Sequence, residues 1–185
     1  GRPITRYAAS TAMQEEMQSS LVLGSFCVLI SLTIGFRSFS QAIVTFLPIL
    51  VVVVWLYGLM FVLGASLNIV TVTIATISLG VGIDYCIHVT ERYRESKKNG
   101  LSHDECLHSI GGACGLALLG SATSDIVGFS VIAISPMGLF SSFGIFSAAM
   151  IALSLFASLV LTTSLLGLND AIQARRRKQD SNPAL

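Results

Sequence analysis

The sequence is poor in charged residues. Asp, Glu, Lys and Arg together make up 11% of it, whereas hydrophobic residues make up 53%. A soluble domain of ordinary composition has roughly 25% charged residues, and the mean hydropathy of +0.78 is correspondingly high. The shortage of charge excludes an ordinary soluble domain and predicts a membrane protein. A net charge of +1 gives no reason to expect a nucleic-acid partner, and we predict none.

Motifs for redox, metal and nucleotide chemistry are also missing. The four cysteines have no Cys-x-x-Cys spacing, so we expect neither a disulfide nor a metal site. No Gly-x4-Gly-Lys is present, so ATP is not the evident energy source. We predict no enzyme activity and no cofactor. Because the chain begins at Gly1 without an initiator Met or a signal peptide, we also expect it to be part of a longer protein.

Five apolar runs follow one another along the chain, each near the length of about 20 residues that spans a bilayer. They cover residues 21–36, 42–63, 67–90, 110–134 and 139–168. They predict an all-α, polytopic bundle of five transmembrane helices over residues 21–168, in the cell membrane. Residues 7–20 favour helix without a break, so we expect residues 1–20 to be the end of an outer domain with a helical stalk. Residues 169–185 are predicted to be a basic tail.

Most of the Lys and Arg residues are gathered in three short stretches between or after the apolar runs. These are Arg37, residues 92–98 and residues 175–178. If the three stretches share one side of the membrane, the five helices alternate in direction without conflict. Cytoplasmic loops carry an excess of Lys and Arg, so this side is predicted to be cytoplasmic, with the N-terminus outside and the C-terminus cytoplasmic.

The third apolar run contains an acidic residue, Asp84. It lies roughly 10 Å from Glu91, the first charged residue at the end of the run. A carboxylate at that depth costs about 3 kcal/mol, so it is a candidate functional residue. Tyr85 follows it directly, and His88 lies one turn further along the same helix face. We predict that Asp84, Tyr85 and His88 hold or pass a proton.

A second acidic residue, Asp125, lies in the fourth run. It is roughly 21 Å from Gly111 at the start of that run, whereas Asp84 is roughly 10 Å deep. Because the two depths differ, we expect no direct pair between Asp84 and Asp125. Asp125 is a candidate for lining an outer cavity, and a purely structural role is equally open.

Small residues are predicted to bring helices close together. Gly80 and Gly82 present no side chain one turn and half a turn before Asp84, and the fourth run has glycine or serine at four-residue spacing through Gly120 and Gly128. Such spacing is typical of tight packing between membrane helices. We therefore predict close helix contacts at these four glycines.

The Gly80 to Tyr85 stretch resembles the fourth or tenth helix of the resistance-nodulation-division (RND) superfamily. Its lipid- and amphiphile-exporting branches, including the MMPL type, carry Asp-Tyr after Gly-x-Gly-x. Further agreeing segments are Leu67-Asn68-Ile-Val-Thr71, Arg92-Tyr93-Arg94-Glu95, Gly128-Phe129, Ser135-Pro136 and Phe143-Gly144. The chain resembles helices two to six of one half of such a transporter. Two features depart from the pattern: Leu161 to Leu165 lacks a proline, and Asp125 is unexpected in its stretch.

The resemblance implies export of lipids or other hydrophobic or amphiphilic compounds, driven by the proton gradient, with Asp84 as the protonation site. Protonation removes the desolvation cost of a buried carboxylate, which can bias a bundle with two states. The implied partners are membrane lipids, the other half of the transporter, its outer domains and an amphiphilic substrate.

Three other functions are compatible with parts of the sequence. The same five-helix block occurs in sterol-sensing scaffolds, which bind lipid and need not transport it, and in the SecD/SecF protein-export accessory group. Intramembrane aspartyl proteases use Gly-x-Gly-Asp with a second Asp on a neighbouring helix. Here Gly80 to Asp84 is one residue too long for that motif, and the predicted depth of Asp125 also disfavours it.

Overall fold

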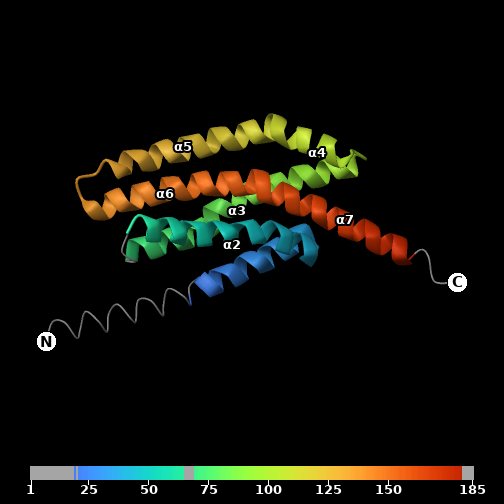
Figure 1. Cartoon of the computed structure of the whole chain (residues 1–185), viewed down its shortest axis with the longest axis horizontal. Helices are drawn as coiled ribbons and strands as arrows, with labels where there is room; N and C mark the ends of the chain where they lie inside the picture. Colours follow the sequence, from blue (N-terminus) through green and yellow to red (C-terminus); the bar gives the residue numbers. More distant parts are fainter. Residues whose placement is uncertain (1–18, 20, 65–68, 181–185) are drawn as a thin grey trace.

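The computed structural model describes Ser19 and residues 21–64 and 69–180. All regular structure in this part of the chain is helical, and the long helices lie side by side with their axes nearly parallel (Figure 1). The helices are Leu21–Phe36, α2 Phe39–Val62, α3 Ile69–Lys98, α4 His103–Ser109, η1 Ile110–Cys114, α5 Gly115–Ala133, α6 Gly138–Ala157, η2 Ser158–Thr162 and α7 Thr163–Asp180. The predicted all-α architecture is confirmed for the described residues.

Two of the long helices contain a π-helical segment, so that α4, η1 and α5 form one rod and α6, η2 and α7 form another. In η1, Gly112 leaves helical geometry with φ −75° and ψ −122°, which marks a kink. At the end of this kink, a Cβ on Gly115 would lie 2.9 Å from the Ile110 carbonyl oxygen, so the kinked backbone needs a glycine there. Such segments are frequent at functional sites.

Three helices of the described residues are long and apolar enough to cross a membrane: α2, the α4–α5 rod and the α6–α7 rod. The Leu21–Phe36 helix is apolar but shorter in its described part. The described residues thus form five long helical stretches, as predicted. Three of the five meet the length and composition of a membrane span. The predicted stalk in residues 7–20 lies outside the described residues, apart from Ser19, which is helical.

Several helices extend beyond the predicted membrane segments. α3 continues past Thr90 to Lys98, and α7 continues past Leu168 to Asp180. The stretch predicted to be a basic tail from residue 169 is thus helical up to Asp180, because nothing before that residue breaks the helix. A capping box starts α4: Ser102 and Glu105 exchange hydrogen bonds there.

The three basic stretches lie at one end of the bundle. Figure 1 shows the turn after Leu21–Phe36, the loop between α3 and α4, and the length of α7 at the same end, and the α5–α6 turn at the other. We call the end that holds the three basic stretches the basic end. This arrangement agrees with the predicted alternation of the helices; which side of the membrane the basic end faces is a prediction from the sequence alone.

Polar side chains join the helices at the basic end. The Tyr93 hydroxyl donates a hydrogen bond to Asp170 Oδ2 at 2.8 Å and lies 3.0 Å from His103 Nδ1. Lys97 Nζ lies 3.3 Å from the same Asp170 oxygen. Burial and the neighbouring Asp170 raise the pKa of the Tyr93 phenol above its ordinary value, so it stays protonated. This cluster ties α3, α4 and α7 together.

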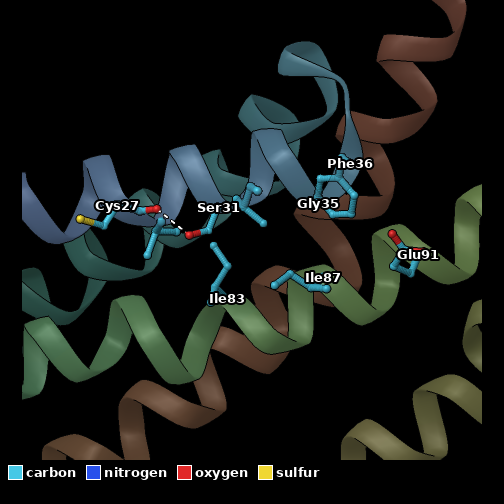
Figure 2. Close-up of a pocket in the computed structure, with 9 residues that line it drawn as sticks. Cys27, Ser31, Gly35, Phe36, Ile83, Ile87 and Glu91 are labelled. Carbon is cyan, nitrogen blue, oxygen red and sulfur yellow. Dashed lines mark hydrogen bonds between the residues drawn. The ribbon is translucent and has the colours of Figure 1, made fainter.

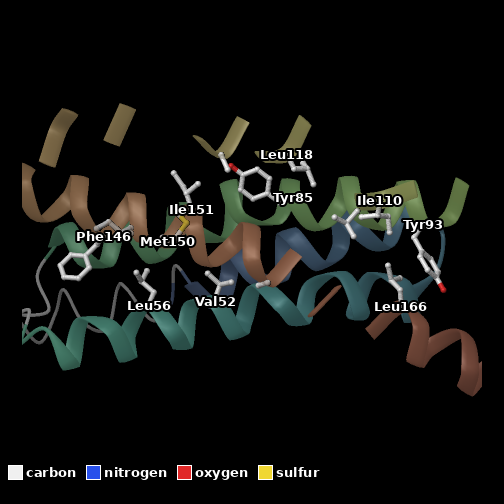
Figure 3. Packing of buried hydrophobic residues seen from close by; sticks show 14 of the residues in the cluster. Val52, Leu56, Tyr85, Tyr93, Ile110, Leu118, Phe146, Met150, Ile151 and Leu166 are labelled. Carbon is white, nitrogen blue, oxygen red and sulfur yellow. The ribbon is translucent and has the colours of Figure 1, made fainter. Parts of the chain in front are cut away.

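The core lies where α2, α3 and α6 meet, and Figure 3 shows its members along the bundle. Val52 and Leu56 of α2 and Met150 and Ile151 of α6 are fully or almost fully buried. The outside of the bundle is apolar too, with large side chains such as Phe61 87% exposed. An apolar exterior of this kind suits hydrocarbon and not water.

Several glycines lie at close approaches between helices. A Cβ on Gly82 would lie 2.9 Å from Ser154 Oγ, and one on Gly144 would lie 2.5 Å from the Phe129 carbonyl oxygen. At Gly80, Gly120 and Gly128 the space beside the glycine is open, with no atom of another helix within 4 Å. In the described part of the chain no helix packs against these three glycines, so close packing there stays a prediction.

Candidate functional site

A cavity of about 450 Å³ lies between α3 and the η1–α5 part of its neighbouring rod. It brings together the three residues predicted to handle protons and the second acid, Asp125. Its lining residues are Val81, Asp84, Tyr85 and His88 of α3, Cys114 of η1, and Ala117, Leu118, Ser121 and Asp125 of α5. Two carboxylates, an imidazole, a phenol and a hydroxyl therefore share one cavity.

Asp84 and His88 lie one turn apart on the open side of α3. Both side chains are exposed, and in the described part of the chain neither has a hydrogen bond or an ion pair. In the described part of the chain the Asp84 side chain is therefore open, because the cavity separates this face of α3 from η1 and α5. Full burial of Asp84 stays a prediction. An acid without a partner can bind and release a proton without breaking an existing contact.

Tyr85, in the same cavity, points towards α5. Its side chain is only 4% exposed and lies beside Leu118 (Figure 3). Its hydroxyl donates a hydrogen bond to Asp125 Oδ2 at 3.2 Å. Tyr85 thus follows Asp84 in the chain and contacts Asp125 in space, which places it between the two acids.

The position of Asp125 corrects the depth argument made from the sequence. The depth of each acid was counted along its helix from Glu91 or Gly111, as if both residues lay at the same membrane edge. The length of a tyrosine side chain was not included. In the structure Asp125 shares the cavity of Asp84 and contacts Tyr85 directly. The two acids therefore belong to one site, with Tyr85 and not Asp84 as the immediate neighbour of Asp125.

Two further lining residues, Ser121 and Cys114, were not singled out from the sequence. Ser121 lies one helical turn before Asp125, so the spacing of four residues could have placed both on one face. Cys114 ends the π-helical segment, and no sequence signal marks it for the cavity.

Replacing Tyr85 by Phe should remove the hydrogen bond to Asp125 while keeping the packed ring. We expect the free energy of unfolding to fall by about 1 kcal/mol, the usual net contribution of such a bond. Thermal or denaturant unfolding of the purified protein in detergent measures it. Tyr57→Phe is the matched control, because the Tyr57 hydroxyl is buried and has no hydrogen-bond partner among the described residues. This variant should be neutral or slightly more stable. Equal losses in the two variants would contradict the assigned bond.

Comparisons with known proteins agree with this architecture. The sequence profile described as the MMPL family matches residues 1–182. MJ1562 of Methanocaldococcus jannaschii, which is named as a membrane protein, is 30% identical over 166 residues; the match covers 90% of this chain and 43% of that protein. SCO6666 of Streptomyces coelicolor, also named as a membrane protein, is 24% identical over 172 residues, covering 90% of this chain and 24% of that protein. The chain thus spans less than half the length of these relatives.

Proposed function

This chain belongs to the MMPL family of membrane proteins, and on that basis we propose that it is one membrane half-domain of a proton-driven exporter of lipids or other amphiphiles. The observation that carries the proposal is the cavity in which Asp84, Tyr85, His88 and Asp125 meet. Titratable groups gathered within membrane helices are typical of proton pathways. We place the protein in the cell membrane.

In the proposed cycle, Asp84 takes up a proton from the open side of the cavity and later releases it. A carboxylate that becomes neutral loses its demand for water and for hydrogen-bond donors. Tyr85 donates its hydroxyl hydrogen to Asp125 in the deprotonated state of that acid. A proton arriving at Asp84 removes one negative charge from the cavity that Tyr85 and Asp125 also line, which changes the strength of the contact between Tyr85 and Asp125. That contact joins α3 to α5, so a change in its strength alters how these two helices are held together.

The proposal assigns no catalytic residue and no cofactor, since the proton gradient supplies the energy. It requires partners outside this chain. Because Gly80, Asp84 and His88 are exposed on α3 in the described part of the chain, we propose that a second half of the transporter covers them. Outer domains would then select the substrate.

The test is export by the full-length protein reconstituted into liposomes with an imposed pH gradient. A fluorescent amphiphile should move only while the gradient lasts, and a protonophore should reduce its flux to the level of empty liposomes. A flux that does not depend on the pH gradient would contradict proton coupling. Binding of the amphiphile without any flux would instead favour a lipid-sensing scaffold.

A further inference from the structure

A second cavity, of about 360 Å³, lies between α3 and the Leu21–Phe36 helix. We call it the Cys27–Glu91 groove. Its lining residues are Cys27, Val28, Ser31, Leu32, Gly35 and Phe36 of the first helix and Ile83, Ile87 and Glu91 of α3. Figure 2 shows Ile83 and Ile87 pointing from α3 towards the first helix, with Glu91 one turn further along.

The groove follows helical periodicity on both walls. On α3, Ile83, Ile87 and Glu91 are spaced by four residues, so they form one row along the helix. The facing wall repeats at the same spacing from Cys27 to Gly35. Ser31 is the one hydroxyl of the lining, and its Oγ donates to the Cys27 carbonyl oxygen of its own helix at 2.9 Å. The groove is therefore apolar along its length and suits a hydrocarbon chain.

The end of the groove at the basic end of the bundle is charged. Arg94 contacts Glu91 Oε1 with Nη1 at 3.1 Å and donates from Nη2 to the Phe36 carbonyl oxygen at 3.3 Å. Its guanidinium also lies over the Phe36 ring, 5.2 Å from the ring centre. Arg94 is thus occupied, whereas Glu91 is 56% exposed and has a second carboxylate oxygen without an assigned partner in the described part of the chain. The free polar group at this end is thus a negatively charged hydrogen-bond acceptor, the second carboxylate oxygen of Glu91.

From this combination we propose that the Cys27–Glu91 groove binds one acyl chain of a phospholipid whose head group carries a primary ammonium. The ammonium binds Glu91, and Arg37, the exposed residue that follows Phe36, faces the phosphate. A cavity of 360 Å³ lies in the lower part of the range of roughly 300–1,000 Å³ for small-molecule sites, so it takes a single chain. The groove does not include Asp84, and the proposal is independent of proton coupling.

The test measures lipid retention by the full-length protein. The delipidated protein is equilibrated in detergent with equal amounts of phosphatidylethanolamine and phosphatidylglycerol, and native mass spectrometry counts the bound lipids. One phosphatidylethanolamine should be retained with about tenfold preference, the effect expected of one charge-assisted hydrogen bond. Preference for phosphatidylglycerol, or no retained lipid, would overturn the proposal.

Two variants separate the chain site from the head-group site. Gly35→Leu fills the groove, and it should fold normally because no atom lies within 4 Å of the added Cβ; lipid retention should fall at least about tenfold. Glu91→Gln should keep a lipid but bring the preference close to one. Gly58→Leu is the matched control, since Gly58 also has open space and does not line the groove. Retention by Gly35→Leu at the level of Gly58→Leu, or an unchanged preference in Glu91→Gln, would refute the assignment.

Discussion

Asp84→Asn should reduce gradient-driven export by at least about a hundredfold, the lower end of what a positioned proton-transfer group contributes. The amide has nearly the same size and shape as the carboxyl but cannot bind or release a proton at any accessible pH. The side chain is exposed and has no hydrogen bond or ion pair in the described part of the chain, so the loss should not come from misfolding. Proteoliposome flux, normalised to the amount of folded protein, gives the measurement.

The matched control for this variant is Asp104→Asn. Asp104 is an exposed acid in the first turn of α4, outside the cavity, and undergoes the same chemical change. It should leave export within about twofold of wild type, because exposed charges away from a site contribute little. Export by Asp84→Asn at the level of Asp104→Asn would remove the basis of the transporter proposal.

Gly144→Ala should have the largest effect on stability, a loss of about 2–3 kcal/mol in the free energy of unfolding, which is typical of overpacking. The added Cβ would fall against the backbone of α5, within 2.5 Å of the Phe129 carbonyl oxygen and in contact with the Ala133 nitrogen. Backbone atoms cannot rotate aside as a side chain does. The α5 rod would have to move away from α6, which would also strain the bond between Tyr85 and Asp125.

Gly58→Ala makes the same substitution in the interior of α2, where no atom lies within 4 Å of the new Cβ. It should be neutral or stabilising by up to about 1 kcal/mol, since alanine favours helix over glycine. Thermal unfolding of Gly144→Ala and Gly58→Ala in the same detergent measures the difference in stability that is due to packing at Gly144. Similar stabilities for the two proteins would show that α5 and α6 are not in close contact at Gly144.

Much of the fold followed from local sequence properties. Long apolar runs indicate the long helices, and the spacing of Ser102 and Glu105 is typical of a helix start, here that of α4. Both patterns depend only on residues that are neighbours in the sequence. The ends of α3 and α7 were underestimated. Polar residues stop a membrane run but do not stop a helix, and no glycine or proline intervenes before Lys98 or Asp180.

The candidate site was only half predictable. The spacing of Asp84 and His88 on one face follows from helix geometry. The contact between Tyr85 and Asp125 depends on how α5 is placed against α3, which is set by tertiary packing at residues such as Gly82 and Gly144. Spacing alone could not distinguish Gly82 and Gly144, which lie against a neighbouring helix, from Gly120, which does not. A glycine permits a close approach but does not show that another helix makes it.

The junction of Tyr93, His103 and Asp170 also fixes which tautomer the histidine adopts. A phenol has one hydrogen, and Tyr93 gives it to the Asp170 carboxylate. The remaining contact, at 3.0 Å, therefore requires hydrogen on His103 Nδ1, which leaves the lone pair of the neutral imidazole on Nε2.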